Sequence, residues 1–139
     1  MNDADFEAAK ERIKAIVGIW HKVLGLDWWR MTYLYSREKI VSESGDGFTC
    51  LGMAHVQWQY QAATITLNVP SLADESDSVV EMVVIHEMMH VFLHETREQT
   101  DDWAKHEDRV ASTLTSAIIR TRNLQGNLKT EEAKDGEVT

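Results

Sequence analysis

The stretch from Val79 to His94 constrains this chain more than any other part of its sequence. It is almost wholly apolar, contains neither Gly nor Pro, and is too long for an ordinary strand, so it predicts a buried central helix. Within it, the polar residues His86, Glu87 and His90 lie at positions where burial is expected. Burying such groups is costly unless something in the protein interior needs them. The helix is therefore expected to carry a buried polar site.

These three residues form the pattern HExxH. Residues four apart lie one turn above each other on a helix, so His86 and His90 can aim two imidazoles at one metal ion, and zinc suits such ligands. Glu87 lies about 100° further around the helix, where it can act as general base on a metal-bound water. The alternative, a chance pentapeptide with two core histidines, fits the apolar helical context less well. The pattern predicts one zinc ion per chain.

Length and charge limit the class of protein. The 139 residues are expected to form one domain over residues 1–122, followed by a polar tail, 123–139, that is expected to be disordered. The formal charge of −9, with no cluster of Lys and Arg, argues against binding to nucleic acid. The sequence shows no membrane span and no signal peptide, so a cytoplasmic protein with no membrane partner is expected.

The remaining segments predict an α+β fold. An amphipathic pattern indicates a helix from Asp3 to about Leu24, and a second long helix is expected from about Asp101 to Arg122. Three stretches indicate strands, and the last two are expected to form an antiparallel hairpin. The expected strands are Arg30–Tyr35, Phe48–Tyr60 and Ala62–Val69. The result is an N-terminal helix, a sheet of about three strands, the HExxH helix and a C-terminal helix.

Two segments resemble a known family. HEMMHVFLH is similar to the HExxHxxLH of the ImmA/IrrE-like zinc metallopeptidases, and HEDRVASTL is similar to their later glutamate and small-residue helix. The resemblance covers roughly Thr64 to Ile119 and implies a zincin-like minimal metallopeptidase core of the gluzincin type. Met89 departs from the family by replacing a usual small residue. No helix-turn-helix or other substrate-recognition domain accompanies the core, so the resemblance implies an activity more than a substrate.

The third zinc ligand must come from outside HEMMH. His94 is the next histidine on the same helix, but ligands spread over two turns cannot comfortably reach one ion, so His94 is expected at the helix end or behind a ligand. The resemblance implies four site residues: the zinc ligands His86, His90 and Glu107, and the catalytic base Glu87. Glu107 also falls near the centre of the apolar stripe on the predicted C-terminal helix, where a buried carboxylate needs a facing cation. His106 falls at the flank of that stripe. Asp101 and Asp102 are competitors with a simpler explanation as helix-start residues.

The expected function is zinc-dependent hydrolysis of peptide bonds in a protein or peptide substrate, by Glu-assisted attack of zinc-bound water. By analogy with the family, a regulator is one class of substrate. The first alternative is a non-catalytic, zinc-stabilised protein-binding module, and the second is an acidic structural domain without metal. The sequence does not fix the oligomeric state or the strand at the substrate-binding edge. Nor does it choose the residue that assists oxyanion stabilisation among His55, Tyr60, Arg97 and Arg109.

Overall fold

The structure is a computed structural model that describes residues 1–41, 49–96 and 101–136. Within these ranges the chain forms four helices and five strands, which confirms the predicted α+β class. The helices are α1 (Asp3–Val23), α2 (Val69–Ala73), α3 (Asp77–Leu93) and α4 (Asp101–Gly136). The strands are β1 (Arg30–Ser36), β2 (Ile40–Val41), β3 (Thr49–Cys50), β4 (Gly52–Gln57) and β5 (Ala62–Asn68).

Three strands form the main sheet in the order β1-β5-β4, so β4 lies at one edge. β1 runs parallel to β5, and β4 pairs antiparallel with β5, which confirms the expected hairpin. The single strand expected over Phe48–Tyr60 is divided at Leu51 into β3 and β4, which belong to different sheets, and Phe48 lies outside the described residues. Its end is also earlier than predicted, because Trp58–Tyr60 forms a 3-10 turn that leads into Gln61 in the left-handed region, at φ 47°. β2 and β3 pair separately as a small ribbon.

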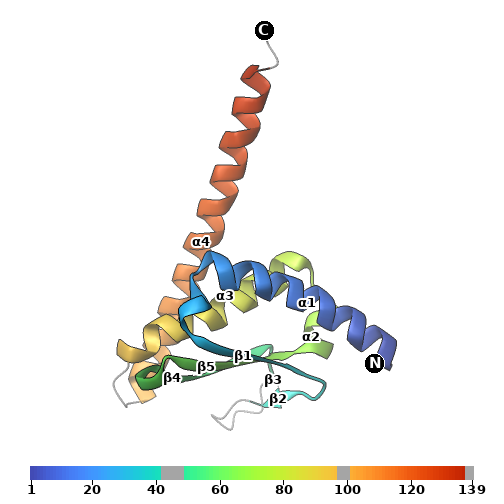
Figure 1. Cartoon of the computed structure of the whole chain (residues 1–139), viewed down its shortest axis with the longest axis vertical. Helices are drawn as coiled ribbons and strands as arrows, with labels where there is room; N and C mark the ends of the chain where they lie inside the picture. Colours follow the sequence, from blue (N-terminus) through green and yellow to red (C-terminus); the bar gives the residue numbers. More distant parts are fainter. Residues whose placement is uncertain (42–48, 97–100, 137–139) are drawn as a thin grey trace.

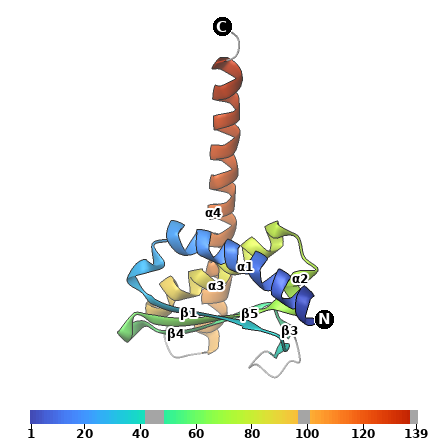
Figure 2. The ribbon, with the colours of Figure 1, turned by 45° about the vertical axis from the view of Figure 1, so that its right-hand side comes forward.

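Figures 1 and 2 both place α1 and α3 on the same side of the main sheet. Alternation along the strands sends apolar side chains toward these helices and polar ones to the open face. The shared core contains Ile13, Val17 and Trp20 from α1, Ile65 and Leu67 from β5, and Val84, Ile85 and Met88 from α3. α3 is therefore buried along most of its length, as its apolar sequence predicts.

Hydrogen bonds from α1 fix the start of α3. The guanidinium of Arg12 donates to the carbonyl oxygens of Leu72 and Glu75 at 2.9 and 3.1 Å, and it pairs with the carboxylate of Asp77 at 2.8 Å. Ser76 caps the helix, since its side chain accepts a hydrogen bond from the backbone N–H of Val79. These contacts anchor the N-terminal turn, and so they help to hold the HExxH segment two turns later against the sheet.

α4 is longer than the sequence pattern predicted. We expected it to end near Arg122, but it continues through Gly136, and its C-terminal half projects beyond the other elements in Figure 1. The added segment contains KTEEAK, which is rich in good helix formers, and its glycines weaken a helix without excluding it. The disorder expected for the tail 123–139 stays a prediction, and residues 137–139 lie outside the described residues. None of the described helices is both long and apolar enough to cross a membrane.

Candidate active site

The two histidines of the HExxH segment lie side by side on α3. The Nε2 atoms of His86 and His90 are 3.2 Å apart, and the ring planes are inclined at 76°. Two nitrogens that bind one zinc at its usual distance, with a tetrahedral angle between them, lie about 3.3 Å apart. The helical spacing of four residues therefore sets the two nitrogens at a separation that suits a shared metal ion.

A carboxylate of α4 faces both nitrogens. Asp108 Oδ1 lies 2.9 Å from His86 Nε2 and 3.3 Å from His90 Nε2. The three ligand atoms lie within 4.8 Å of one another, and no other cluster of three or more possible metal ligands occurs in the described ranges. Two imidazole nitrogens and a carboxylate oxygen are a donor set that zinc accepts in catalytic sites. The residues present therefore fit a zinc ion.

Glu107 approaches the site from the other side of His90. It is buried, at 7% exposed, and its Oε1 lies 2.8 Å from Nδ1 of His90, the ring nitrogen that points away from Asp108. Its Oε2 is buried without a hydrogen-bond partner in the described part of the chain. A carboxylate in this position orients the imidazole and fixes which nitrogen carries the proton. The structure brings Glu107 to the site, and its role as a direct ligand stays a prediction.

The other residues considered as third ligands lie differently. His106 is exposed on α4, with its ring 6.4 Å from that of Trp103, and it does not join the cluster. Asp101 and Asp102 begin α4, as expected of helix-start residues, and their side chains lie outside the described residues. His94 is the C-cap residue of α3.

Sequence reasoning missed two residues of α4 that contact the histidines. Asp108 faces both Nε2 atoms, and Ser112 Oγ lies 3.2 Å from Nδ1 of His86. Asp108, Ser112 and Ser116 recur every four residues, which is the spacing of one helix face. That spacing is a signal for a polar face on α4, although it does not say what the face contacts.

Glu87 is buried beside the histidines without a hydrogen bond to any described residue. Its side chain is 8% exposed, and this burial raises the pKa of Glu87 to about 7 from its ordinary value of 4.5. His90 opposes the rise, and Asp108 adds to it. Burial and the neighbouring His90 also lower the pKa of His86, which favours the neutral imidazole that metal binding requires. In the metal-free chain, burial thus favours the protonated form of Glu87 at a pH where an exposed carboxyl group is ionised.

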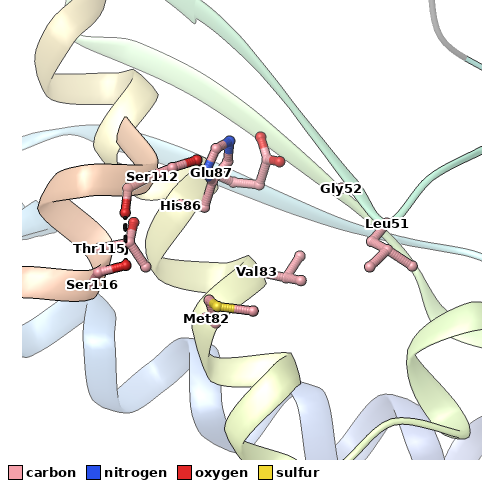
Figure 3. Close-up of a pocket in the computed structure, with 9 residues that line it drawn as sticks. All are labelled: Leu51, Gly52, Met82, Val83, His86, Glu87, Ser112, Thr115 and Ser116. Atoms are coloured by element: carbon pink, nitrogen blue, oxygen red, sulfur yellow. Dashed lines mark hydrogen bonds between the residues drawn. The ribbon is translucent and has the colours of Figure 1, made fainter. Parts of the chain in front are cut away.

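Gly52 provides the space that Glu87 occupies. A Cβ atom at this position of β4 would lie 2.9 Å from Cγ of Glu87 and 3.3 Å from its Cδ and Oε1. Any other residue would therefore push the carboxylate aside. Figure 3 shows Glu87 reaching from α3 toward the strand that carries Gly52. No pattern in the sequence indicates this contact, because it depends on how the strand packs against the helix.

A pocket of about 310 Å³ opens beside His86 and Glu87, between the start of β4, α3 and α4 (Figure 3). Its lining residues are Leu51, Gly52, Met82, Val83, His86, Glu87, Ser112, Thr115 and Ser116. None of the expected oxyanion-stabilising residues that the structure describes lines it. His55 is exposed beside a different pocket on the sheet, Tyr60 is 72% exposed, and Arg109 is exposed on α4. Arg97 lies outside the described residues.

Comparison with known proteins places this site in a family. Residues 36–123 match the SprT-like family, and this segment contains both histidines, Glu87, Glu107, Asp108 and the pocket. No curated protein and no solved structure matches the chain. The ImmA/IrrE-like family that the motif resembles is not the family matched, and the two agree at the coarser level of zincin-like, metallopeptidase-related domains. Because the match spans more than half of the 139 residues, the chain belongs to the SprT-like family.

Proposed function

We propose that this chain is a zinc-dependent metallopeptidase of the gluzincin type that hydrolyses peptide bonds of a protein or peptide substrate. The observation that carries the proposal is Glu87, a residue only 8% exposed, whose carboxylate lines a pocket without a hydrogen-bond partner in the described part of the chain and lies next to a histidine pair spaced for one metal ion. Burying such a group costs stability, so its retention favours a chemical role.

In this proposal His86 and His90 hold the zinc through Nε2, and α4 supplies the third ligand. Two adjacent carboxylates compete for that role. Glu107 is the ligand expected from the sequence, whereas Asp108 is the carboxylate that faces both Nε2 atoms. Zinc titrations of Glu107→Ala, Asp108→Ala and His106→Ala separate the possibilities. Loss of the ligand abolishes tight binding, whereas loss of a residue that only orients a ligand weakens zinc binding by about 10- to 100-fold.

Bound zinc supplies a Lewis acid, which makes an attacking water more acidic and stabilises negative charge on the scissile carbonyl oxygen. The residues of the chain supply the remaining functions. The carboxylate of Glu87 accepts the proton of the attacking water and returns it to the leaving amine, and no hydrogen bond from a described residue competes for it. Glu107 and Ser112 hold the outer nitrogens of His90 and His86, and so they keep both rings oriented.

The sheet offers a way to align the substrate. β4 is an edge strand, and its first residue, Gly52, lies against Glu87. An extended peptide that pairs with this edge would run past the catalytic base, a common mode of peptide recognition. β1 forms the other edge of the main sheet and contributes no residue to the pocket. The topology therefore favours β4 as the substrate-binding edge.

Hydrolysis of unfolded proteins tests the proposal against the zinc-stabilised binding module. The full chain, loaded with zinc, is incubated with a panel of denatured proteins, and new peptide termini are identified by mass spectrometry. We expect cleavage by the wild-type chain and none by Glu87→Gln, which keeps the shape of the side chain but not its basicity. If the zinc-loaded chain cleaves none of the panel, the binding module becomes the better account.

A further inference from the structure

We infer that the pocket beside Glu87 selects an uncharged, apolar side chain of the substrate, at a residue adjacent to the bond that is cleaved. The inference rests on the proposed function and names the class of peptide on which the site acts. The pocket of about 310 Å³ is at the small end of ligand pockets, which are typically about 300–1,000 Å³. It therefore suits one bulky side chain better than a long segment of a ligand.

One wall of the pocket is apolar. Met82 and Val83 from α3 face Leu51, which lies just before β4 (Figure 3). Met82 is 46% exposed although α3 is otherwise largely buried. An apolar side chain that entered the pocket would cover this surface, and removing apolar surface from water favours binding. The flexible thioether of Met82 can adjust to side chains of different shape.

The opposite wall carries hydroxyl groups from α4 that are already hydrogen bonded. Thr115 Oγ1 donates to the carbonyl oxygen of Ala111 at 2.7 Å, and Ser116 Oγ donates to that of Ser112 at 3.1 Å. Ser112 Oγ lies 3.2 Å from His86 Nδ1. Two of the three hydroxyl hydrogens are thus committed to backbone carbonyls and are not free to donate to an anionic side chain.

The pocket offers no positive countercharge for an acidic side chain, because no Lys or Arg of the described chain lines it. Its ionisable lining residues are His86 and Glu87, and the proposed function assigns both to zinc binding and proton transfer rather than to pairing with a basic side chain. A charged side chain would lose its hydration without gaining a partner, which is costly. The pocket adjoins Glu87, so its occupant belongs to a residue next to the reacting carbonyl. We therefore expect an apolar residue there to be favoured about 10- to 100-fold over a charged one.

Cleavage-site profiling tests the inference through a change of specificity. Zinc-loaded wild type, Met82→Glu and Leu34→Glu are incubated with the same peptide library. Leu34 is the matched control, because it is 50% exposed, close to the 46% of Met82, and does not line the pocket. We expect wild type and Leu34→Glu to favour Leu, Met or Phe at one position flanking the cleaved bond, and Met82→Glu to gain Lys and Arg there. A uniform wild-type profile, or one that Met82→Glu leaves unchanged, overturns the inference.

A binding measurement separates this inference from the proposed function. The full chain, with zinc and without it, is titrated with N-acetyl-leucinamide and with the corresponding aspartate amide, while NMR follows the methionine methyl groups. We expect the Met82 methyl to shift with the leucine compound alone, and Met31 and Met53, which do not line the pocket, to stay constant. If the Met82 methyl shifts with the leucine compound alone but no peptide is cleaved, the proposed function is contradicted, whereas the preference of the pocket for apolar side chains is supported. Equal responses to both compounds, or none, would overturn the selectivity even if peptides are cleaved.

Discussion

Glu81 and Glu87 lie six residues apart on α3, and both are largely withdrawn from solvent, but their surroundings differ. The Glu81 carboxylate accepts a hydrogen bond from Nε1 of Trp20 at 3.0 Å and pairs with the guanidinium of Arg122. It thereby joins α3 to α1 and α4. Glu87 has no such partner among the described residues and lies against the space left by Gly52.

The contrast separates a carboxylate that joins helices from one that is proposed to react. A buried carboxylate whose oxygens are hydrogen bonded contributes to the packing of three helices and has little left to offer a substrate. A carboxylate that is buried without partners is disfavoured in its ionised form, and this burial raises the pKa of Glu87 to about 7. Its proton affinity then suits catalysis near neutral pH. Burial alone does not distinguish the two residues, whereas their hydrogen-bond partners do.

The largest expected effect is on activity in Glu87→Gln. Removing the general base should lower kcat by about 10²- to 10⁴-fold, because proton transfer by a positioned base contributes that much to rate. Zinc content and the far-ultraviolet circular dichroism spectrum should stay those of wild type. Steady-state kinetics on a peptide identified from the cleavage panel measures the effect. A variant that retains near wild-type kcat would show that Glu87 is not the base.

The second expectation concerns the pH dependence of stability in the metal-free chain. The pKa of Glu87 is higher in the folded protein, at about 7, than its ordinary 4.5, so the folded state binds more protons than the unfolded state between these values. Stability contributed by protonated Glu87 is therefore full below pH 4.5 and is lost as the pH rises to about 7. The loss is on the order of 3 kcal/mol.

Urea unfolding of wild type and Glu87→Gln at pH 5 and pH 8 measures this difference. The glutamine side chain of the variant does not titrate, so the variant does not lose this contribution as the pH rises. We therefore expect the free energy of unfolding to fall more from pH 5 to pH 8 in wild type than in the variant. Comparing the two proteins cancels the contribution of the histidines, to the extent that their pKa values are the same in both. Parallel pH profiles would show that Glu87 is not strained by burial.

A smaller effect is expected from Gly52→Ala, which leaves Glu87 in place but displaces its carboxylate. The added Cβ would lie 2.9 Å from Cγ of Glu87, closer than real Cβ contacts allow, so the carboxylate must shift. We expect kcat to fall by about 10- to 100-fold with zinc binding retained, because small displacements of catalytic groups are costly. Gly18→Ala is the matched control, because its Cβ would meet nothing within 4 Å. Equal kinetics in the two variants would show that the space left by Gly52 is not needed for the position of Glu87 in catalysis.

The smallest effect is expected at the structural glutamate. Glu81→Gln keeps an acceptor for Trp20 but loses the charge that pairs with Arg122. We expect unfolding to become easier by about 1–2 kcal/mol, the order of a hydrogen bond to a charged group, with kcat unchanged below the unfolding transition. Denaturant unfolding and the same peptide assay check both parts. A large fall in kcat in the folded variant would show that Glu81 also contributes to activity and is not only structural.

Patterns within single segments of the sequence predicted the helices and strands whose formation depends on the residues of that segment. The apolar run predicted α3, and the amphipathic pattern predicted α1. Gly25 follows the C-cap of α1 in the left-handed region, at φ 72°, a conformation that glycine adopts without strain. Alternation predicted the hairpin of β4 and β5. The helical spacing of His86 and His90 likewise predicted that the two imidazoles would meet.

What the sequence could not show depends on packing between elements. Asp108 reaches the histidines only because α4 crosses α3 at a particular rotation, and Glu107 instead contacts the outer nitrogen of His90. The contact of Gly52 with Glu87 likewise requires β4 to lie against α3. No periodicity in the chain encodes such a rotation or approach. The length of α4 was missed for another reason, since its C-terminal half has no amphipathic pattern from which to predict a packed helix.

The central claim is that His86 and His90 form a zinc site beside an unpartnered base. Its most direct test is the zinc content of the full chain after reconstitution and removal of unbound metal, measured by elemental analysis for wild type, His86→Ala and Glu87→Gln. The account predicts about one zinc per chain in wild type and in Glu87→Gln, and close to none in His86→Ala, because the proposed site uses the imidazole of His86 as a ligand and does not use the carboxylate of Glu87. A ratio near zero in the wild-type chain would contradict it.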